Sequence, residues 1–215
     1  MFRHSERIDA ANYTIGLSVV KLVRETVMSS ADAIKWNERY RSGAEAAFES
    51  PRDFLIEQAP HLPKQGLALD IAMGLGGNAG FLIERGLRVI GVDVSEVGMR
   101  RAKQRWPSLM GAVIDLTPYR WPVCAFDVIL NFYYCQRALW SQYRSMLKPG
   151  GVLVLETLTI ETLHTRPDYH PDFLLQPGEL RQTFAAWDVL VYREGWIEVE
   201  GHSPRAVASL VARRP

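Results

Sequence analysis

Residues 69–80 read LDIAMGLGGNAG, and this stretch decides the fold. The apolar run that leads to Asp70 is typical of a strand buried on both faces. Gly74, Gly76 and Gly77 follow closely, and glycine permits positive φ and lets a ligand approach backbone amides. Because ligands of open α/β sheets bind where the strands end, the stretch predicts a binding loop between a strand and a helix.

The chain around this loop alternates short apolar runs with helical stretches. Runs rich in Val, Ile and Leu predict five buried strands in series, over 67–71, 88–94, 111–115, 126–132 and 151–157. Helical patterns with recognisable start or stop residues lie between them, over 78–86, 95–106 and 138–151. This alternation predicts parallel strands joined by right-handed crossovers, as in a Rossmann-like doubly wound sheet.

The pattern changes after Pro177, where a helix is predicted over 178–187 and strands over 188–194 and 206–213, separated by a loop. We therefore expect an α/β fold with a seven-stranded sheet, mostly parallel, that finishes with an antiparallel C-terminal strand pair. With 215 residues, 47% of them hydrophobic, the chain can bury one large core. We expect a single domain over 36–215, preceded by a partly helical N-terminal extension over 1–35.

Charge and cysteine content limit the classes of function. The chain has 25 basic and 24 acidic residues, so no global field attracts it to nucleic acid or to a membrane. Its two cysteines suit a reducing cytoplasm, and the N-terminus does not read as an export signal. We expect a cytoplasmic protein without a membrane segment. The most concentrated basic run is predicted to be the solvated outer face of a helix: Arg100, Arg101, Lys103 and Arg105.

Two acids stand at the ends of the next strands. Asp93, followed by Val94, ends the second strand, at the distance from the glycines where a carboxylate can accept both hydroxyls of a ribose. Asp115 ends the third strand and can accept from an adenine amino group, while the amide of Leu116 meets a ring nitrogen. An adenosine-containing ligand is therefore predicted. Both a nicotinamide-dependent oxidoreductase and another adenosine-cofactor enzyme would fit these residues.

Taken together, these motifs resemble the class I S-adenosylmethionine-dependent methyltransferases. The first motif of that family is D-x-G-x-G-x-G, and LDIAMGLGGN matches it at Asp70, Gly74 and Gly76, with Ala72 in place of the first glycine. GVDVS, VIDL, FDVILNFYY and LKPGGVLVLET resemble the later motifs in the correct order. The resemblance implies S-adenosyl-L-methionine as cofactor, held by Ala72, Gly74, Gly76, Asn78, Asp93, Val94, Asp115, Leu116 and Asn131.

A second, narrower resemblance rests on two segments, one before the core and one near the end of the chain. WNERYRSG before the core and FLLQPGELRQTFAAW near the end resemble the tellurite-resistance-type and related small-molecule methyltransferases. That resemblance implies that the N-terminal aromatic residues Trp36 and Tyr40 close over the cofactor. The fourth strand ends in NFYY, whereas amino-group methylases of nucleic acids carry an N-P-P-Y/F type motif. Nucleic acid is therefore an improbable substrate.

The methyl acceptor is expected over the ends of the fourth and fifth strands. Tyr134, Arg137 and Arg166 are candidates for acceptor binding, and Glu156 lies in the same stretch. The sequence identifies no catalytic residue firmly, and its weak candidates are Tyr133, His164 and His170. No metal-ligand arrangement is recognisable, so we expect no metal.

The resemblance implies direct displacement of the sulfonium methyl group by a small-molecule nucleophile, with alignment as the main task of the enzyme. Two alternatives stay open. One is an NAD-dependent oxidoreductase, which would use a similar glycine loop and ribose acid. The other is a protein that binds S-adenosylmethionine without catalysis. The sequence indicates neither the acceptor atom nor the oligomeric state.

Overall fold

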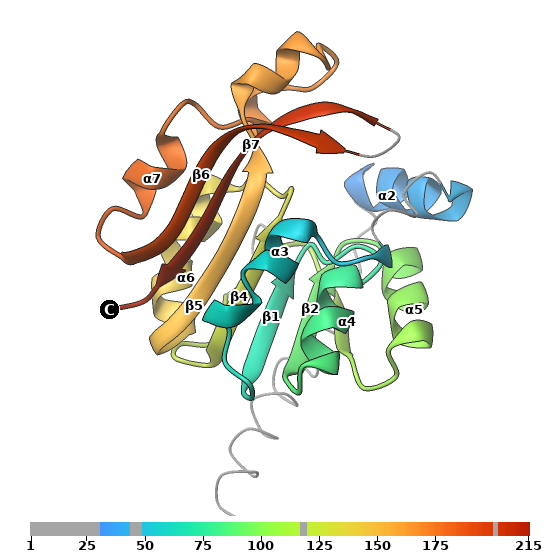
Figure 1. The fold of residues 1–215 in the computed structure, drawn as a ribbon. Coiled ribbons are helices and arrows are strands. Elements are labelled where there is room, and N and C mark those ends of the chain that lie inside the picture. Colours follow the sequence, from blue (N-terminus) through green and yellow to red (C-terminus); the bar gives the residue numbers. More distant parts are fainter. Residues whose placement is uncertain (1–30, 44–48, 117–119, 200–201) are drawn as a thin grey trace, which may run out of the picture.

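The computed structural model describes residues 31–43, 49–116, 120–199 and 202–215 (Figure 1). These residues contain a seven-stranded sheet with the strand order β3-β2-β1-β4-β5-β7-β6. Strands β1 to β5 are parallel, and β7 is antiparallel to both β5 and β6. The predicted fold class is confirmed, with an antiparallel pair at the C-terminal end. The strands are β1 (Leu67–Ile71), β2 (Arg88–Asp93), β3 (Met110–Val113), β4 (Phe126–Phe132), β5 (Leu147–Leu158), β6 (Asp188–Val199) and β7 (His202–Arg213).

Helices cover both faces of the sheet. The α-helices are α2 (Ala31–Ser42), α3 (Asp53–Glu57), α4 (Gly77–Glu84), α5 (Glu96–Arg105), α6 (Arg137–Met146) and α7 (Glu179–Thr183). The 3-10 turns are η3 (Ala59–His61), η4 (Ile160–His164) and η5 (Pro171–Phe173). One core cluster contains the buried residues of α6, and another contains those of α3, α4 and α5. The fold is therefore doubly wound, as the alternating pattern predicts.

Burial explains why the central strands are apolar throughout. All five residues of β1 are buried, and alternate residues contribute to opposite core clusters: Leu67 and Leu69 to one, Ala68 to the other. A strand with helices on both faces has no solvent side, so its sequence need not alternate with polar residues. Asp70, the residue before the last in β1, is the one polar side chain of this strand, and it is buried as well, with 1% of its surface exposed.

Several elements differ from their predictions. Helix α6 ends at Met146 and β5 begins at Leu147, both inside the helix predicted over 138–151. Helix α7 ends at Thr183, before the predicted limit at 187. The predicted loop between the last two strands is mostly strand, because Trp196 pairs with Ala206 and Ile197 with Arg205. These pairings extend the β6–β7 hairpin beyond the last residue of β7 that pairs with β5. Pairing across a hairpin added more strand than the local pattern indicates.

Helix α2 begins at Ala31, so the predicted boundary between an extension and the domain falls inside this helix. The rest of the predicted N-terminal extension, residues 1–30, lies outside the described residues. Helix α2 contacts α5, and the domain boundary at residue 36 stays a prediction.

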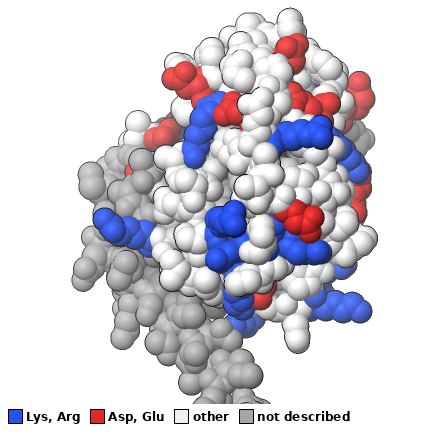
Figure 2. All heavy atoms as spheres, turned by 90° about the vertical axis from the view of Figure 1, so that its left-hand side faces the viewer, with Lys and Arg blue, Asp and Glu red and all other residues white. Residues whose placement is uncertain are grey.

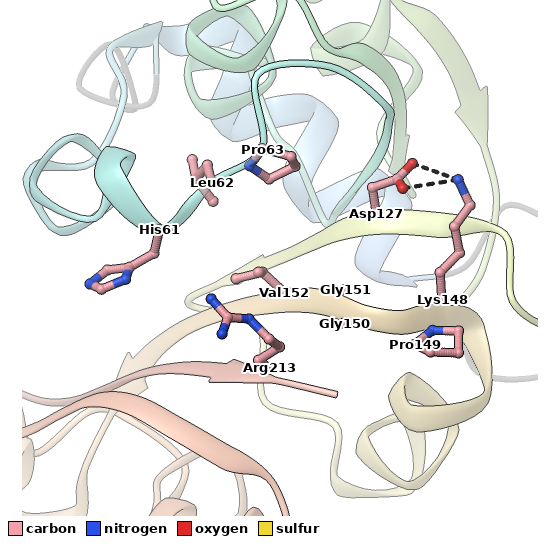
Figure 3. Close-up of a pocket in the computed structure, with 10 residues that line it drawn as sticks. All are labelled: His61, Leu62, Pro63, Asp127, Lys148, Pro149, Gly150, Gly151, Val152 and Arg213. Carbon is pink, nitrogen blue, oxygen red and sulfur yellow. Dashed lines mark hydrogen bonds and ion pairs between the residues drawn. The ribbon is translucent and has the colours of Figure 1, made fainter. Parts of the chain in front are cut away.

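A charged pair lies at the amino edge of the sheet, the edge at which the parallel strands begin. Asp127, at the start of β4, accepts hydrogen bonds from Lys148 Nζ through both carboxylate oxygens, at 2.9 and 2.8 Å, and from the amide of Leu67 at 2.8 Å (Figure 3). A hollow of about 310 Å³ lies beside this pair, between η3 and the start of β5, with Arg213 on its rim. This edge is opposite to the one where the glycine loop lies.

Candidate cofactor and acceptor site

Asp70 marks the centre of the site at the carboxyl edge of the sheet. Its carboxyl is buried, and Oδ2 has no hydrogen-bond partner within the described part of the chain. Burial raises the pKa of Asp70 to about 8, the negative charge of Asp93 raises it further, and a hydrogen bond from the backbone of Ala79 opposes both. A buried carboxyl oxygen without a partner costs free energy, so a ligand that donates to it would be favoured.

Asp93 joins the loops that follow β1 and β2. Its Oδ2 accepts a hydrogen bond from the Gly74 amide at 2.8 Å, and its Oδ1 accepts one from the Ser95 amide at 2.7 Å. Burial raises the pKa of Asp93 to about 6, while backbone hydrogen bonds from Ser95, Gly74 and Val94 lower it. Each carboxylate oxygen can accept more than one bond, so ribose hydroxyls can still bind here.

The glycine loop uses left-handed backbone at three positions. Ala72, Gly74 and Gly76 have φ values of 52°, 59° and 77°. A Cβ on Gly76 would lie 2.8 Å from the Cβ of Ala102, and one on Gly77 would collide with the carbonyl oxygen of Ser50. Packing therefore requires the second and third glycines. Ala72 carries the same backbone strain at a position where the resembled family has glycine.

Helix α2 covers the first glycine. A Cβ on Gly74 would lie 2.9 Å from the Tyr40 hydroxyl, and one on Gly98 would lie 3.0 Å from the Tyr40 ring. The Trp36 ring lies 5.5 Å from that of Tyr40. The structure therefore places Tyr40, the nearer of the two predicted aromatic residues, directly over the loop.

Asn37 is a site residue that sequence reasoning missed. Its Oδ1 accepts hydrogen bonds from the Ser95 hydroxyl at 2.7 Å and from the Val97 amide at 3.0 Å. Ser95 itself caps α5 by accepting from the Gly98 amide at 3.0 Å. A side chain of α2 thus completes the first turn of α5. Its position between Trp36 and Tyr40 in WNERY is the only signal that could have indicated it.

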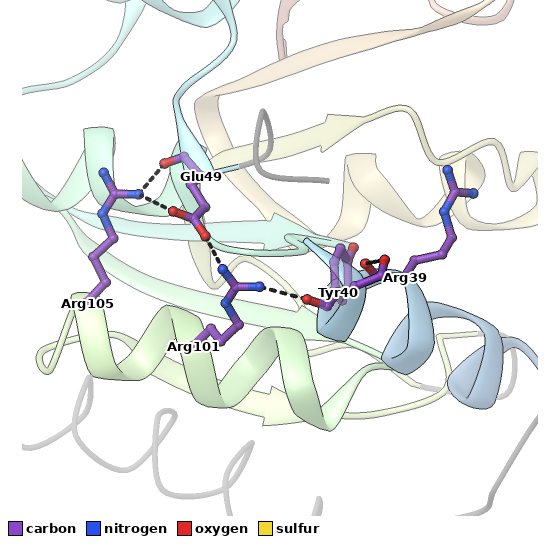
Figure 4. A network of polar contacts seen from close by, with 6 residues as sticks. Arg39, Tyr40, Glu49, Arg101 and Arg105 are labelled. Carbon is purple, nitrogen blue, oxygen red and sulfur yellow. Dashed lines mark hydrogen bonds and ion pairs between the residues drawn. The ribbon is translucent and has the colours of Figure 1, made fainter. Parts of the chain in front are cut away.

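Two arginines of the basic run in α5 bind the end of α2 and the segment before α3 (Figure 4). Arg101 donates to the carbonyl oxygen of Tyr40 at 2.7 Å and pairs with Glu49, and Arg105 donates to the carbonyl oxygen of Glu49 at 2.6 Å. The interpretation of this run as a solvated face is wrong for Arg101, which is only partly exposed, whereas Arg105 is exposed although it makes this contact. It also holds for Arg100, which is largely exposed and pairs, among the described residues, with Glu96 one turn away.

The predicted adenine contacts lie at the end of β3. Asp115 is exposed and Leu116 is buried. The charge of Asp115, after burial itself, contributes to raising the pKa of Tyr134, which places the phenol near this carboxylate. Asn78 has a different task in the structure, since its Oδ1 accepts the Arg52 amide at 2.9 Å. It connects the first turn of α4 to the segment before α3.

Asn131 lies fully buried at the end of β4, beside Ile71 of β1. Its Nδ2 donates to the Tyr143 hydroxyl at 2.7 Å, whereas its Oδ1 has no partner among the described residues. Asn131 and Asp70 therefore both present unsatisfied oxygens, and they stand at the carboxyl ends of the adjacent strands β4 and β1.

The partly exposed Tyr133 and the buried Glu156 form a pair near the ends of β4 and β5. The Tyr133 hydroxyl donates to Glu156 Oε1 at 2.9 Å, and the Ser209 hydroxyl donates to Oε2 at 2.7 Å. Burial raises the pKa of Tyr133 well above its usual value, and the charge of Glu156 acts in the same direction. Tyr133 therefore stays a neutral phenol near neutral pH.

The other residues predicted to bind the acceptor or to act in catalysis bind neighbouring side chains and carbonyl groups. Arg137 binds Glu179 through both carboxylate oxygens and donates to the carbonyl oxygens of Asp172 and Leu174, so it fastens the 172–179 segment to α6. His164 and His170 are 72% and 65% exposed and contact acids of their own segment. Arg166 pairs with Asp168, two residues away. The structure brings none of these four side chains to the glycine loop, because local and structural partners hold them.

Residues 68–151 match the sequence profile of a family described as a methyltransferase domain. No curated protein sequence matches significantly. Within the described residues, no group of His, Cys, Asp or Glu could hold a metal ion, and no helix has the length and apolar character to cross a membrane.

Solved structures of methyltransferases share the fold. TehB from Haemophilus influenzae is 16% identical with a TM-score of 0.65, covering 76% of this chain and 62% of that chain. An S-adenosylmethionine-dependent methyltransferase from Methanosarcina mazei is 15% identical with a TM-score of 0.61, covering 77% and 98%. Geranyl diphosphate C-methyltransferase from Streptomyces coelicolor A3(2) is 15% identical with a TM-score of 0.59, covering 90% of each chain. The chain thus spans less than two thirds of the length of TehB.

The family match and the strand order identify this region as a class I S-adenosylmethionine-dependent methyltransferase domain. Residues 68–151 therefore carry a methyltransferase domain, and S-adenosylmethionine is the methyl donor that this family implies. The match favours methyl transfer over the hydride transfer that the sequence left open. The residues at the carboxyl edge fit this donor, since Asp70 offers a buried carboxyl oxygen that has no partner among the described residues.

Proposed function

We propose that the protein transfers the donor methyl group to a small-molecule nucleophile by direct in-line displacement. The observation that carries this proposal is the buried carboxyl oxygen of Asp70, which has no partner in the part of the chain that the structure describes and lies between the Asp93 loop and the ends of β4 and β5. S-adenosylmethionine supplies an electrophilic methyl group, and the protein must hold that group and the acceptor in line.

The strand order gives the direction of the cofactor. In our proposal Asp115 and Leu116 bind the adenine at the end of β3, and Asp93 binds the ribose at the end of β2. The methionine end then lies over β1 and β4, since these strands follow in the sheet. There Asp70 would accept from the ammonium group, and the acceptor would enter over β4 and β5.

Alignment and exclusion of water are the main contributions of the protein. Tyr40 already covers Gly74, and α2 is fastened to α5 by Asn37 and Arg101. Positioning of this kind can supply about 7 to 11 kcal/mol in favourable cases. Tyr133 is poorly suited as a phenolate base because burial raises its pKa, and the two exposed histidines lie in a segment of their own.

Three observations support a small acceptor in the cytoplasm. The net charge is +1, and on the face that carries α7 and β6 positive and negative side chains lie interspersed (Figure 2). Geranyl diphosphate C-methyltransferase, one of the similar structures, acts on a small molecule according to its name. The described chain keeps Cys124 and Cys135 as free thiols, which suits a reducing compartment.

Calorimetric titration with S-adenosylmethionine, S-adenosylhomocysteine and NAD tests the cofactor assignment. We expect micromolar binding of the first two ligands and none of NAD. Incubation with methyl-labelled donor and a cell extract, separated by ultrafiltration, then tests the acceptor. Label in the small-molecule fraction is expected, whereas label in RNA, DNA or protein would contradict the small-molecule proposal. Binding without any transfer would indicate a non-catalytic cofactor-binding protein.

A further inference from the structure

Two arginines that are far apart in the sequence, Arg52 and Arg205, lie close to the ring of Tyr133. The Arg52 guanidinium carbon lies 5.0 Å from the centroid of the Tyr133 ring, and that of Arg205 lies 5.6 Å from it. Arg52 precedes α3, whereas Arg205 belongs to β7. We call these three residues the arginine clamp. All three are partly exposed, so a ligand can reach them.

The clamp stands beside the proposed acceptor position. Tyr133 follows β4 directly, and β4 pairs with β1, the strand that leads into the glycine loop. The amide of Arg52 donates to the Asn78 side chain in the first turn of α4. Two separate connections therefore join the clamp to the loop, and both place it at the methyl-donating end of the cofactor in our proposal.

The nearby acids do not pair directly with Arg205. Glu156 lies beneath the clamp, where Tyr133 and Ser209 each donate to one of its oxygens, and its pKa is raised mainly by burial. The charge of Arg52 acts on Glu156 and lowers its pKa, whereas the charge of Asp53, which is exposed at the start of α3, raises it. Within the described ranges no carboxylate forms an ion pair with Arg205, which leaves this guanidinium able to take an external anion.

We propose that the methyl acceptor carries an oxyanion, a carboxylate or a phosphate group, and that Arg52 and Arg205 bind it. Guanidinium groups recognise both anions through paired N–H donors and are less strongly hydrated than ammonium groups. Both guanidinium carbons lie near the Tyr133 ring, at 5.0 and 5.6 Å from its centroid, so a single anion beside the ring could be reached by both groups. This inference rests on the proposed small-molecule methyl transfer and specifies its acceptor.

The first test uses the methyl-labelled products of the small-molecule extract. Anion-exchange chromatography should retain the label at neutral pH. If the group is a phosphate monoester, treatment with phosphatase before chromatography should move the label to the fraction that the column does not retain. If the group is a carboxylate, amidation of carboxyl groups should have the same effect. Label in the unretained, neutral or cationic fraction would overturn the clamp.

Variants give the second test, with the retained extract fraction as acceptor. Arg205→Met and Arg52→Met should each raise the apparent KM for that fraction by about tenfold or more, because a charge-assisted bond is lost. Arg205→Lys should recover part of the effect. The control is Arg181→Met, since Arg181 stacks on Tyr192 at 5.7 Å in another part of the chain. Equal KM values in all four variants would contradict the proposal.

The two proposals fail in different ways. Loss of S-adenosylhomocysteine binding in the unaltered protein would contradict the proposed function itself, whereas normal binding with neutral products contradicts only the clamp. If the extract yields no labelled product, the protein saturated with S-adenosylhomocysteine is titrated with inorganic phosphate and with acetate. Weaker binding of either anion to Arg205→Met, with Arg181→Met unchanged, supports the clamp, and the absence of any difference overturns it.

Discussion

An aspartate stands at each edge of the sheet, and the two carboxyl groups differ in their burial and in their partners. At the amino edge, Asp127 accepts from Lys148 through both oxygens and from the Leu67 amide, so its charge is fully compensated. At the carboxyl edge, Asp70 keeps one oxygen without a partner among the described residues, and its pKa is raised to about 8. The first arrangement is complete within the fold. The second becomes complete when a donor from outside binds, and this difference separates a structural carboxylate from a binding one.

The largest effect is expected at the carboxyl edge. Asp93→Ala removes the proposed ribose acceptor and should weaken S-adenosylhomocysteine binding by about 100-fold or more, since lost hydrogen bonds to a charged group are costly. Calorimetric titration measures the affinity, and circular dichroism verifies the fold. An affinity close to that of the unaltered protein would contradict the assignment of Asp93 as the ribose acceptor. It would also weaken the inference that the carboxyl edge binds the cofactor and the amino edge does not.

The corresponding change at the amino edge should affect folding alone. Asp127→Ala leaves the Leu67 amide without its acceptor and Lys148 without its partner, so the free energy of unfolding should fall by about 1 to 3 kcal/mol. Urea unfolding measures this loss. Affinity for S-adenosylhomocysteine should stay unchanged at a temperature where the variant is folded, and a parallel loss of affinity would show that the two edges are coupled.

The raised pKa of Asp70 predicts a pH dependence of stability without cofactor. The folded state keeps the proton up to about pH 8, whereas the unfolded state releases it near pH 4, so unfolding becomes easier as pH rises. Between about pH 6 and pH 8 the free energy of unfolding should fall by about 2 kcal/mol. Urea unfolding at several pH values measures the slope.

Asp70→Asn should flatten that slope, and saturation with S-adenosylhomocysteine should reduce it in the unaltered protein, because an ammonium group nearby favours the ionised carboxyl. A slope that neither change affects would mean that another group titrates. In that case Asp70 would resemble Asp127 more closely than we infer.

The smallest effect concerns the strained loop. Ala72 has a φ of 52°, a region that glycine adopts without a Cβ clash. Ala72→Gly should therefore stabilise the protein by up to about 1 kcal/mol, since the relief of strain exceeds the entropy cost of glycine. Thermal unfolding measures the shift. Destabilisation would show that the Ala72 methyl group contributes packing that outweighs its strain.

The sequence predicted the elements that depend on local pattern. The central strands β1 and β2 are largely apolar because both faces are covered, and Asp93 ends β2 as expected. The prediction of burial on both faces is wrong for β3, which lies at the sheet edge and is mostly half-buried. Contacts between distant residues could not be predicted in the same way. Asn37 reaches Ser95, and Arg137, predicted to bind the acceptor, is held by Glu179. No local periodicity indicates which of several exposed polar side chains will meet a partner many residues away.

The bond between Asn37 and the Val97 amide has a kinetic consequence. The amide proton of Val97 is protected from solvent by a side chain of another helix, so it exchanges only when α2 moves away from α5. Its exchange rate therefore reports how often the cover over Gly74 opens. Comparison of that rate with the rate of product release would show whether movement of α2 limits turnover.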